Sequence, residues 1–142
     1  MDTQNEKRPA LFGLGEKSND TEHFIGDIYI KEIAGFEKAM LMDSVTFMAG
    51  CINYWHIGQT LFVTDGINWY QEEGKPARLL HADDIVDIPV GVKHWHGASK
   101  NSGFTYLVFE HRSKSALQWL ERVAPVEYEK LHQGVENDEE KM

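Results

Sequence analysis

Short runs of apolar and alternating residues follow one another from residue 24 to residue 110. Turn-forming clusters such as Asp65-Gly66 and Asn101-Ser102-Gly103 separate them. Because alternation with a period of two places one face of a strand on the core, each run predicts a half-buried β-strand. The regular spacing, without a long helical pattern, favours an all-β sandwich or barrel. The expected strands are Phe24–Ile33, Met40–Met48, Ile52–His56, Gln59–Thr64, Asn68–Glu72, Arg78–Leu80, Ile85–Pro89, His94–Gly97 and Phe104–Glu110.

The two ends of the chain have a different pattern. The first residues are polar and interrupted by proline and glycine, which predicts an arm or a covering edge strand. Near the other end, a capping-box outline at 115–118 predicts a helix that Trp119 anchors to the barrel, and a second helical turn is expected beside Pro125. The expected parts are an N-terminal arm (1–23), a barrel (24–112) and a C-terminal helical segment with an acidic tail (113–142).

Charge and composition narrow the classes of function. The 142 residues are enough for one domain with a substantial core. A formal net charge of −9 argues against nucleic acid or an anionic membrane as partner. The single cysteine, Cys51, excludes an internal disulfide and has no basic neighbour to activate it. No apolar run approaches the roughly 20 residues of a membrane span, and the polar N-terminus is no secretory signal, so we expect a soluble cytoplasmic protein.

Three histidines and a glutamine lie where strand alternation brings side chains together. His94 and His96 are two positions apart in an expected strand, so both imidazoles share one face. If Ile57-Gly58 forms a two-residue turn, His56 and Gln59 become cross-strand partners on one face of a hairpin. Imidazole and carboxamide groups are ligands that suit divalent first-row metals. If these faces line the barrel, the pattern predicts a metal site inside it.

These residues resemble the motifs of the cupins, over roughly Leu11 to Leu131. The resemblance implies a single double-stranded β-helix, or jelly-roll, barrel followed by a short C-terminal helical segment. It is similar in detail to a branch that includes manganese-dependent hydroxynitrile lyase-like proteins and the cupin partners of carboxymuconolactone decarboxylases. The matching positions are Gly50 and His56 (G-x5-H), Gln59 and Gly66 (ligand-x6-G), Pro89, Gly91 and His94 (P-x-G-x2-H), and the segments WYQEEGKPAR at 69–78 and KHWHGA at 93–98.

One part of the first motif is shorter here than in the family. Only three positions separate His56 from Gln59, and the second histidine of H-x-H is missing. The resemblance therefore implies a reduced ligand set of His56, Gln59 and His94, which would hold Mn, Fe, Ni or Zn if a metal is retained. His96 is either a substitute ligand that turns toward the site or, as is more common in the family, a pocket residue that faces the substrate.

A second departure concerns the catalytic position. Hydroxynitrile lyase-like members carry a histidine in a T-H-L pattern, and this chain has Thr105-Tyr106-Leu107 there. The resemblance thus implies Tyr106 and His96 as the catalytic pair. A phenol with an ordinary pKa near 10 donates a proton or hydrogen bond more readily than it accepts one at neutral pH. Glu72 and Glu73 are expected on a surface hairpin.

Two interpretations of function follow. The first is a metal-dependent enzyme, of lyase or oxygenase type, acting on a small organic substrate. The alternative is a non-catalytic, degenerate cupin that binds an apolar or aromatic small molecule. In either case we expect a homodimer or higher homo-oligomer formed through a sheet face or edge. The side chains considered for the walls of such a binding module are Tyr54, Phe62, Trp95 and Phe104.

Overall fold

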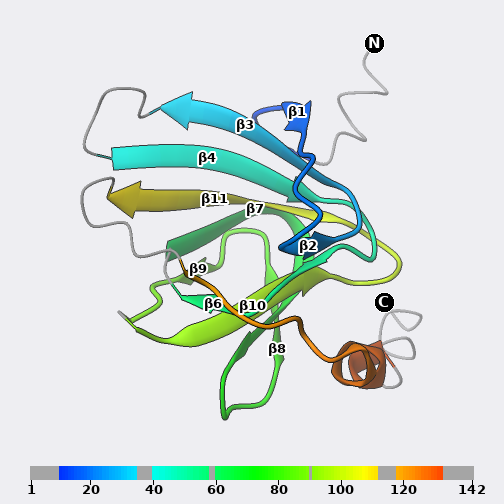
Figure 1. Ribbon diagram of the computed structural model, residues 1–142. Coiled ribbons are helices and arrows are strands. Elements are labelled where there is room, and N and C mark those ends of the chain that lie inside the picture. Colours follow the sequence, from blue (N-terminus) through cyan, green and yellow to red (C-terminus); the bar gives the residue numbers. More distant parts are fainter. Residues whose placement is uncertain (1–9, 35–39, 58–59, 90, 112–117, 133–142) are drawn as a thin grey trace.

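The computed structural model describes residues 10–34, 40–57, 60–89, 91–111 and 118–132 of the chain. Within them, antiparallel strands curl into a half-open barrel, and a short helical segment lies beside it near the C-terminus (Figure 1). The expected all-β jelly-roll class is confirmed. The strands are β1 (Glu16–Lys17), β2 (Phe24–Ile25), β3 (Ile28–Ala34), β4 (Met40–Phe47), β5 (Ile52–Asn53), β6 (His56–Ile57), β7 (Thr60–Glu72), β8 (Arg78–His81), β9 (Ile85–Val86), β10 (Lys93–Ala98), β11 (Phe104–His111) and β12 (Gln118–Trp119).

Two sheets share the long strand β7. Its first half pairs with β11, which continues the sheet through β4 and β3 to the edge strand β1. Its second half pairs with β8 on one side and with β10 on the other, and β10 leads on to β5 and β2. Figure 1 shows the sheets facing each other across the barrel. All these pairings are antiparallel, which explains the clean alternation of apolar and polar residues in the sequence.

The expected turn at Asp65-Gly66 is wrong. These two residues lie inside β7, and the register of the β7–β11 pair shifts between Thr105 and Tyr106. Gly66 has a φ of 80°, and a Cβ on it would lie 2.5 Å from the backbone oxygen of Gly103. Asp65 and Gly66 both pair with β11, and the residue left unpaired in the bulge is Thr64. Gly66 lets the strand continue beside the bulge, because only glycine combines this backbone conformation with so close an approach. The bulge bends β7 so that one strand serves both sheets.

The interior of the barrel is mostly apolar. Alternate residues of β4, β7 and β11 face inward and are almost fully buried. Aromatic rings pack against one another there, with the centroids of Phe47 and Phe104 4.9 Å apart. Such edge-to-face and offset contacts stabilise the core beyond the area they bury. The main inward side chains are Ile28, Val45, Phe47, Leu61, Val63, Tyr70, Leu80, Phe104, Tyr106 and Val108.

A second apolar cluster covers the outer face of the sheet that contains β10. Trp69 and Trp95 point outward there and pack with Val123 and Tyr128 from the C-terminal segment. The Tyr128 hydroxyl donates a 2.8 Å hydrogen bond to the backbone oxygen of Ala98. The helical residues 125–132 are held to the barrel by these contacts. Among the described residues, no helix has the length and apolar character needed to cross a bilayer.

The C-terminal segment differs from its prediction. Gln118 and Trp119 form β12 and pair with β6, so the helix expected to start near residue 115 is wrong for these residues, and 115–117 lie outside the described residues. The helical conformation begins at Pro125, as expected for the second turn. Proline suits a first helical position because its missing N–H would have no partner within the helix.

The N-terminal segment extends the opposite edge of the fold. Glu16 and Lys17 of β1 pair with β3, and Ala10 is fully buried. The backbone N–H of Leu11 donates a 2.8 Å hydrogen bond to the Asp65 carboxylate next to the bulge. A short, charged edge strand of this kind limits edge-to-edge association.

Candidate metal centre

Three histidine side chains converge inside the barrel. His56 on β6 lies directly opposite His94 on β10, and His96 follows two residues along the same face. The ring centroids are 4.2 Å apart for His56 and His94 and 5.3 Å apart for His56 and His96. All three side chains are fully buried. The predicted alternation in His94-Trp95-His96 is confirmed, because Trp95 belongs to the outer apolar cluster.

Backbone carbonyls fix the orientation of two of the rings. Nδ1 of His56 lies 2.9 Å from the Tyr54 oxygen, and Nδ1 of His94 lies 3.1 Å from the Val92 oxygen. A carbonyl only accepts, so each Nδ1 carries the proton and each neutral ring keeps its lone pair on Nε2. Proteins orient metal-binding histidines through the same kind of contact at the second nitrogen.

The donor set fits a divalent metal. One nitrogen from each of the three rings lies within 4.8 Å of the other two. Two nitrogens bonded to one ion at about 2.1 Å are at most about 4.2 Å apart, so the observed separation is close to that range. The Nε2 of His94 is buried and has no hydrogen-bond partner among the described residues. A buried nitrogen lone pair without a partner costs free energy, which an ion at this point would recover.

Burial favours the neutral form of two of the three rings. It lowers the pKa of His94. It also lowers the pKa of His96 well below the usual value, and the charges that His56 and His94 would carry act in the same direction. Deprotonated imidazoles are the form that binds metals, so the environment prepares these side chains for coordination at neutral pH.

Comparisons with known proteins agree with this geometry. A cupin-like protein from Thermotoga maritima is 33% identical, with a TM-score of 0.78 over 84% of this chain and 95% of that one. This chain belongs to the cupins. It is also 40% identical over 89 residues to an (R)-mandelonitrile lyase from Granulicella tundricola, which covers 60% of this cupin and 68% of the lyase. No protein-family model matches the sequence.

More distant structures share only the fold. A DMSP lyase from Ruegeria pomeroyi is 20% identical, with a TM-score of 0.57 over 76% of this chain and 57% of that one. A cupin-2 domain from Rhodospirillum rubrum is 14% identical, with a TM-score of 0.60 over 75% and 74% of the two chains. These structural similarities support the assignment of the barrel fold. They indicate no particular reaction, because one fold can host many reactions.

The shortened motif of this cupin is built differently from the expected hairpin. Ile57, expected in a turn, is the last residue of β6, and its pairing partners are Lys93 of β10 and Gln118 of β12. Among the described residues, the cross-strand partners of His56 are His94 and Trp119. Gln59, predicted as a ligand, lies outside the described residues.

His96 has a different surrounding from the other two histidines. The Asn53 Oδ1 accepts a 2.9 Å hydrogen bond from the His96 backbone N–H, which leaves the Asn53 NH₂ group pointing at the imidazole. That group lies 3.1 Å from Nε2 and 3.4 Å from Nδ1. A neutral ring that accepts this bond has one nitrogen occupied and a proton on the other. Asn53 therefore fixes the orientation of the His96 ring through a hydrogen bond to one of its nitrogens.

Two aromatic residues border His96, one of them predicted and one not. The ring centroid of Tyr106, the predicted catalytic residue, lies 4.8 Å from that of His96. The ring centroid of Phe47 lies 5.4 Å from that of His96, on the same side as Tyr106. Phe104 and Trp95 were both expected to line the cavity of a binding module. The ring centroid of Phe104 lies 6.2 Å from that of His96, whereas Trp95 faces the outside of the barrel.

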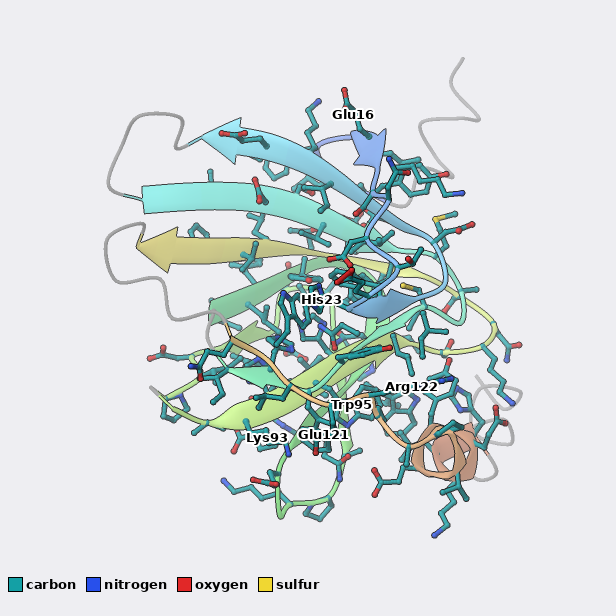
Figure 2. All side chains as sticks on the ribbon, viewed as in Figure 1. Glu16, His23, Lys93, Trp95, Glu121 and Arg122 are labelled. Atoms are coloured by element: carbon teal, nitrogen blue, oxygen red, sulfur yellow. The ribbon has the colours of Figure 1, made fainter. Side chains whose placement is uncertain are left out.

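Sequence reasoning missed the cover of the site. Trp119 lies opposite His56 in the β6–β12 pair, with ring centroids 5.0 Å apart. Its other side stacks on His23, which is labelled near the centre of Figure 2, with ring centroids 4.6 Å apart. Trp119 thus contacts the histidine cluster rather than anchoring a helix. Only the long-range β6–β12 pairing brings it there, and nothing in its local pattern indicates that pairing.

Glu72 and Glu73 lie at the hairpin that joins β7 to β8, as expected, and Glu73 is exposed. The Glu72 side chain, however, is only 17% exposed and lies on the inner face, opposite His94. Its carboxylate accepts a 3.0 Å hydrogen bond from Tyr70 and forms a 3.0 Å ion pair with Lys75. The Lys75 contact, followed by the Tyr70 hydrogen bond, holds the pKa of Glu72 below its usual value. A charged carboxylate thus borders the histidine cluster.

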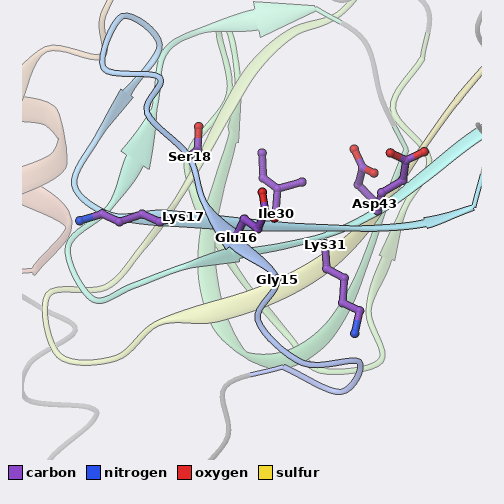
Figure 3. A pocket seen from close by; sticks show the side chains of 8 residues that line it. Gly15, Glu16, Lys17, Ser18, Ile30, Lys31 and Asp43 are labelled. Carbon is purple, nitrogen blue, oxygen red and sulfur yellow. The ribbon is translucent and has the colours of Figure 1, made fainter.

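A surface hollow of about 780 Å³ lies away from this centre, on β1, β3 and β4. Figure 3 shows Lys17 and Lys31 pointing away from each other there. None of its lining side chains belongs to the histidine cluster. Without converging polar groups, the hollow carries no candidate site.

Proposed function

We propose that this cupin is a divalent-metal-dependent lyase that acts on a small oxygenated organic molecule. The observation that carries the proposal is the buried His56–His94 pair, with the partnerless Nε2 of His94 directed into the barrel. The similarity to a curated (R)-mandelonitrile lyase supports a lyase reaction. His56, His94 and Gln59 are the proposed ligands, and Mn, Fe, Ni and Zn all suit such nitrogen and carboxamide donors.

Each residue near the centre has a proposed task. A metal held there supplies Lewis acidity toward a substrate oxygen. His96, held by Asn53 with one ring N–H left over, donates a hydrogen bond to negative charge that develops on the substrate. The Tyr106 hydroxyl, on the next wall of the cavity, is the proposed proton donor to the leaving group. Trp119 and His23 limit the entry of water from the open side.

The alternative is a binding module without catalysis. One observation favours it: the ligand group found among the described residues consists of imidazoles alone, without the carboxylate that strengthens many metal sites. In that case the same cavity would bind a small aromatic molecule between Phe47 and Tyr106.

Metal content separates the two proposals. Protein purified without chelator should contain close to one equivalent of Mn, Fe, Ni or Zn by mass spectrometry. His94→Ala should lose that metal, whereas His81→Ala, which removes an exposed histidine on β8 away from the cluster, should keep it. Added metal at a hundred times its dissociation constant should raise the free energy of unfolding by about 2.7 kcal/mol in the wild type only. Metal-free wild-type protein that is indifferent to added ions would leave only the binding module.

Activity is the second half of the test. The wild type, loaded with its metal, should release cyanide from mandelonitrile faster than His94→Ala does. Tyr106→Phe should lower kcat by about tenfold or more while metal content stays unchanged, because the removed hydroxyl acts on the substrate and not on the ion.

A further inference from the structure

A cleft adjoins the histidine cluster at the end of the barrel. It has a volume of about 410 Å³, which is within the range of small-molecule pockets. Tyr70 forms its inner wall, and β8 and the preceding turn form the rest. The lining side chains are Tyr70, Glu72, Lys75, Pro76, Ala77 and Arg78.

The strand register connects this cleft to the proposed metal centre. Arg78 on β8 lies opposite Tyr70 on β7, and Tyr70 lies opposite His96 on β10. Directly opposed residues of antiparallel strands share a face, so these three side chains form one row across the inner surface. The ring centroids of Tyr70 and His94 are 5.7 Å apart. A small molecule that enters the cleft is therefore separated from the histidines by a single aromatic ring.

The cleft has a net positive charge, because Lys75 and Arg78 line it together with a single carboxylate, that of Glu72. Its one carboxylate, Glu72, is already bound by Lys75 and by the Tyr70 hydroxyl. The Arg78 guanidinium has no ion pair with any acidic side chain in the described parts of the chain. It lies over the Tyr70 ring, with Cζ 5.4 Å from the centroid. This contact restrains the side chain at the entrance and leaves its N–H groups free for a ligand.

Of the small anionic groups, a carboxylate matches these properties best. The planar fork of a guanidinium binds the two oxygens of a carboxylate side by side, and the charge strengthens both hydrogen bonds. We propose that Arg78 anchors a carboxylate group of the substrate, with the cleft beside Tyr70 as the outer end of the substrate pocket. The preferred substrates are thus small hydroxy- or oxo-carboxylates, which should bind more tightly than the uncharged mandelonitrile of the activity test. This assignment rests on the proposed function, because it takes the histidine centre as the reacting end.

Binding of a matched pair of probes tests the proposal without turnover. Mandelate and mandelamide differ only in the carboxylate, and calorimetry on chelator-treated protein measures binding in the absence of a metal. The wild type should bind mandelate at least tenfold more tightly than mandelamide. Arg78→Gln should weaken mandelate binding by about tenfold, to the level of the amide, as loss of a charge-assisted pair predicts. Arg122→Gln, which removes an exposed arginine of the C-terminal segment, should leave the affinities for mandelate and mandelamide unchanged.

The outcomes separate this subsite from the proposed reaction. Loss of mandelate binding in Arg78→Gln, together with normal binding in His94→Ala, supports the subsite even if no metal is ever found. Equal binding of the two probes by the wild type overturns the subsite, and so does an Arg78→Gln variant that binds mandelate normally. Arg78→Lys keeps the charge and loses the fork, so binding between those of the wild type and Arg78→Gln would confirm bidentate contact. Arg78 is exposed, and circular dichroism should show an unchanged fold in each variant.

Discussion

His56 and His94 are direct cross-strand partners, with ring centroids 4.2 Å apart on the inner face of the barrel. They come from the two separate motifs of the sequence. Backbone pairing between β6 and β10 brings the two rings together.

Removing the Asn53 side chain should strengthen metal binding. Asn53 donates to a ring nitrogen of His96, and a lone pair used in this way is not available to an ion. In Asn53→Ala the imidazole regains that lone pair and can turn toward His56 and His94. We expect a metal dissociation constant at least several-fold lower, measured by competition with a chelator.

A fall in affinity would contradict this role for Asn53, because it would mean that Asn53 positions His96 as a ligand. Asn53→Asp is the matched variant, since it keeps the acceptor for the His96 backbone N–H. Nitrogen NMR of the His96 ring should show the change of hydrogen bonding directly. Asn53 is buried, so both variants should also lose about 1–3 kcal/mol of stability.

The metal-free protein should lose stability as the pH falls below about 6.5. Burial lowers the pKa values of His94 and His96 in the folded protein, whereas the unfolded chain binds protons on these rings near pH 6.5. At pH values between the folded-state pKa values and about 6.5, the unfolded state binds more protons than the folded state. The free energy of unfolding therefore decreases as the pH falls through this range. The loss ends once the pH lies below the folded-state pKa values.

Urea unfolding at pH 7.5 and pH 5.5 measures this loss. Each histidine should contribute up to about 1.4 kcal/mol per pH unit below 6.5. His96→Gln should show a smaller difference between the two pH values than the wild type. Equal stability of the wild type at both values would show that these rings are not held neutral by burial.

Trp119→Ala should expose the histidine cluster. The indole contacts His56 on one side and His23 on the other, and the truncation removes both contacts. We expect a loss of about 2–4 kcal/mol in the free energy of unfolding and faster extraction of bound metal by a chelator. Leu120→Ala, at the neighbouring exposed position, should affect neither measurement by much. Unchanged extraction kinetics in Trp119→Ala would exclude a covering role.

Gly97→Ala should destabilise the sheet that carries His94 and His96. A Cβ at this position would lie 2.4 Å from Cγ2 of Ile52 on the neighbouring strand β5. Overpacking of this kind typically costs about 1–3 kcal/mol. Ile52→Ala removes the closest atom, so the double variant should be more stable than the sum of the two single changes predicts. Strict additivity in thermal unfolding would show that the clash is relieved elsewhere.

The local pattern was sufficient to predict the histidine face of β10. In His94-Trp95-His96, strand alternation alone requires that the imidazoles share a side and that the indole occupies the other. The cupin motifs supplied the fold, because glycine, proline and histidine at fixed spacing report turns and inward positions. These features depend on residues a few positions apart, which a sequence shows directly.

Features that depend on distant pairing could not be predicted in this way. Asp65-Gly66 carries the same residue types as a turn, and only pairing with β11 decides that both residues continue a strand, next to a bulge at Thr64. Trp119 lies in a segment with helical spacing, yet pairing with β6 draws it into a strand. Tertiary hydrogen bonds outweigh local propensity at both places.

The stacking of His23 against Trp119 has a consequence for biosynthesis. Every strand that carries a proposed ligand leaves the ribosome before residue 119, so a nascent barrel displays its imidazoles to the surrounding medium until the last part of translation. Capture of an ion at that stage would precede docking of the indole. Cells starved of the correct ion during synthesis should therefore accumulate closed, empty protein that loads only slowly afterwards.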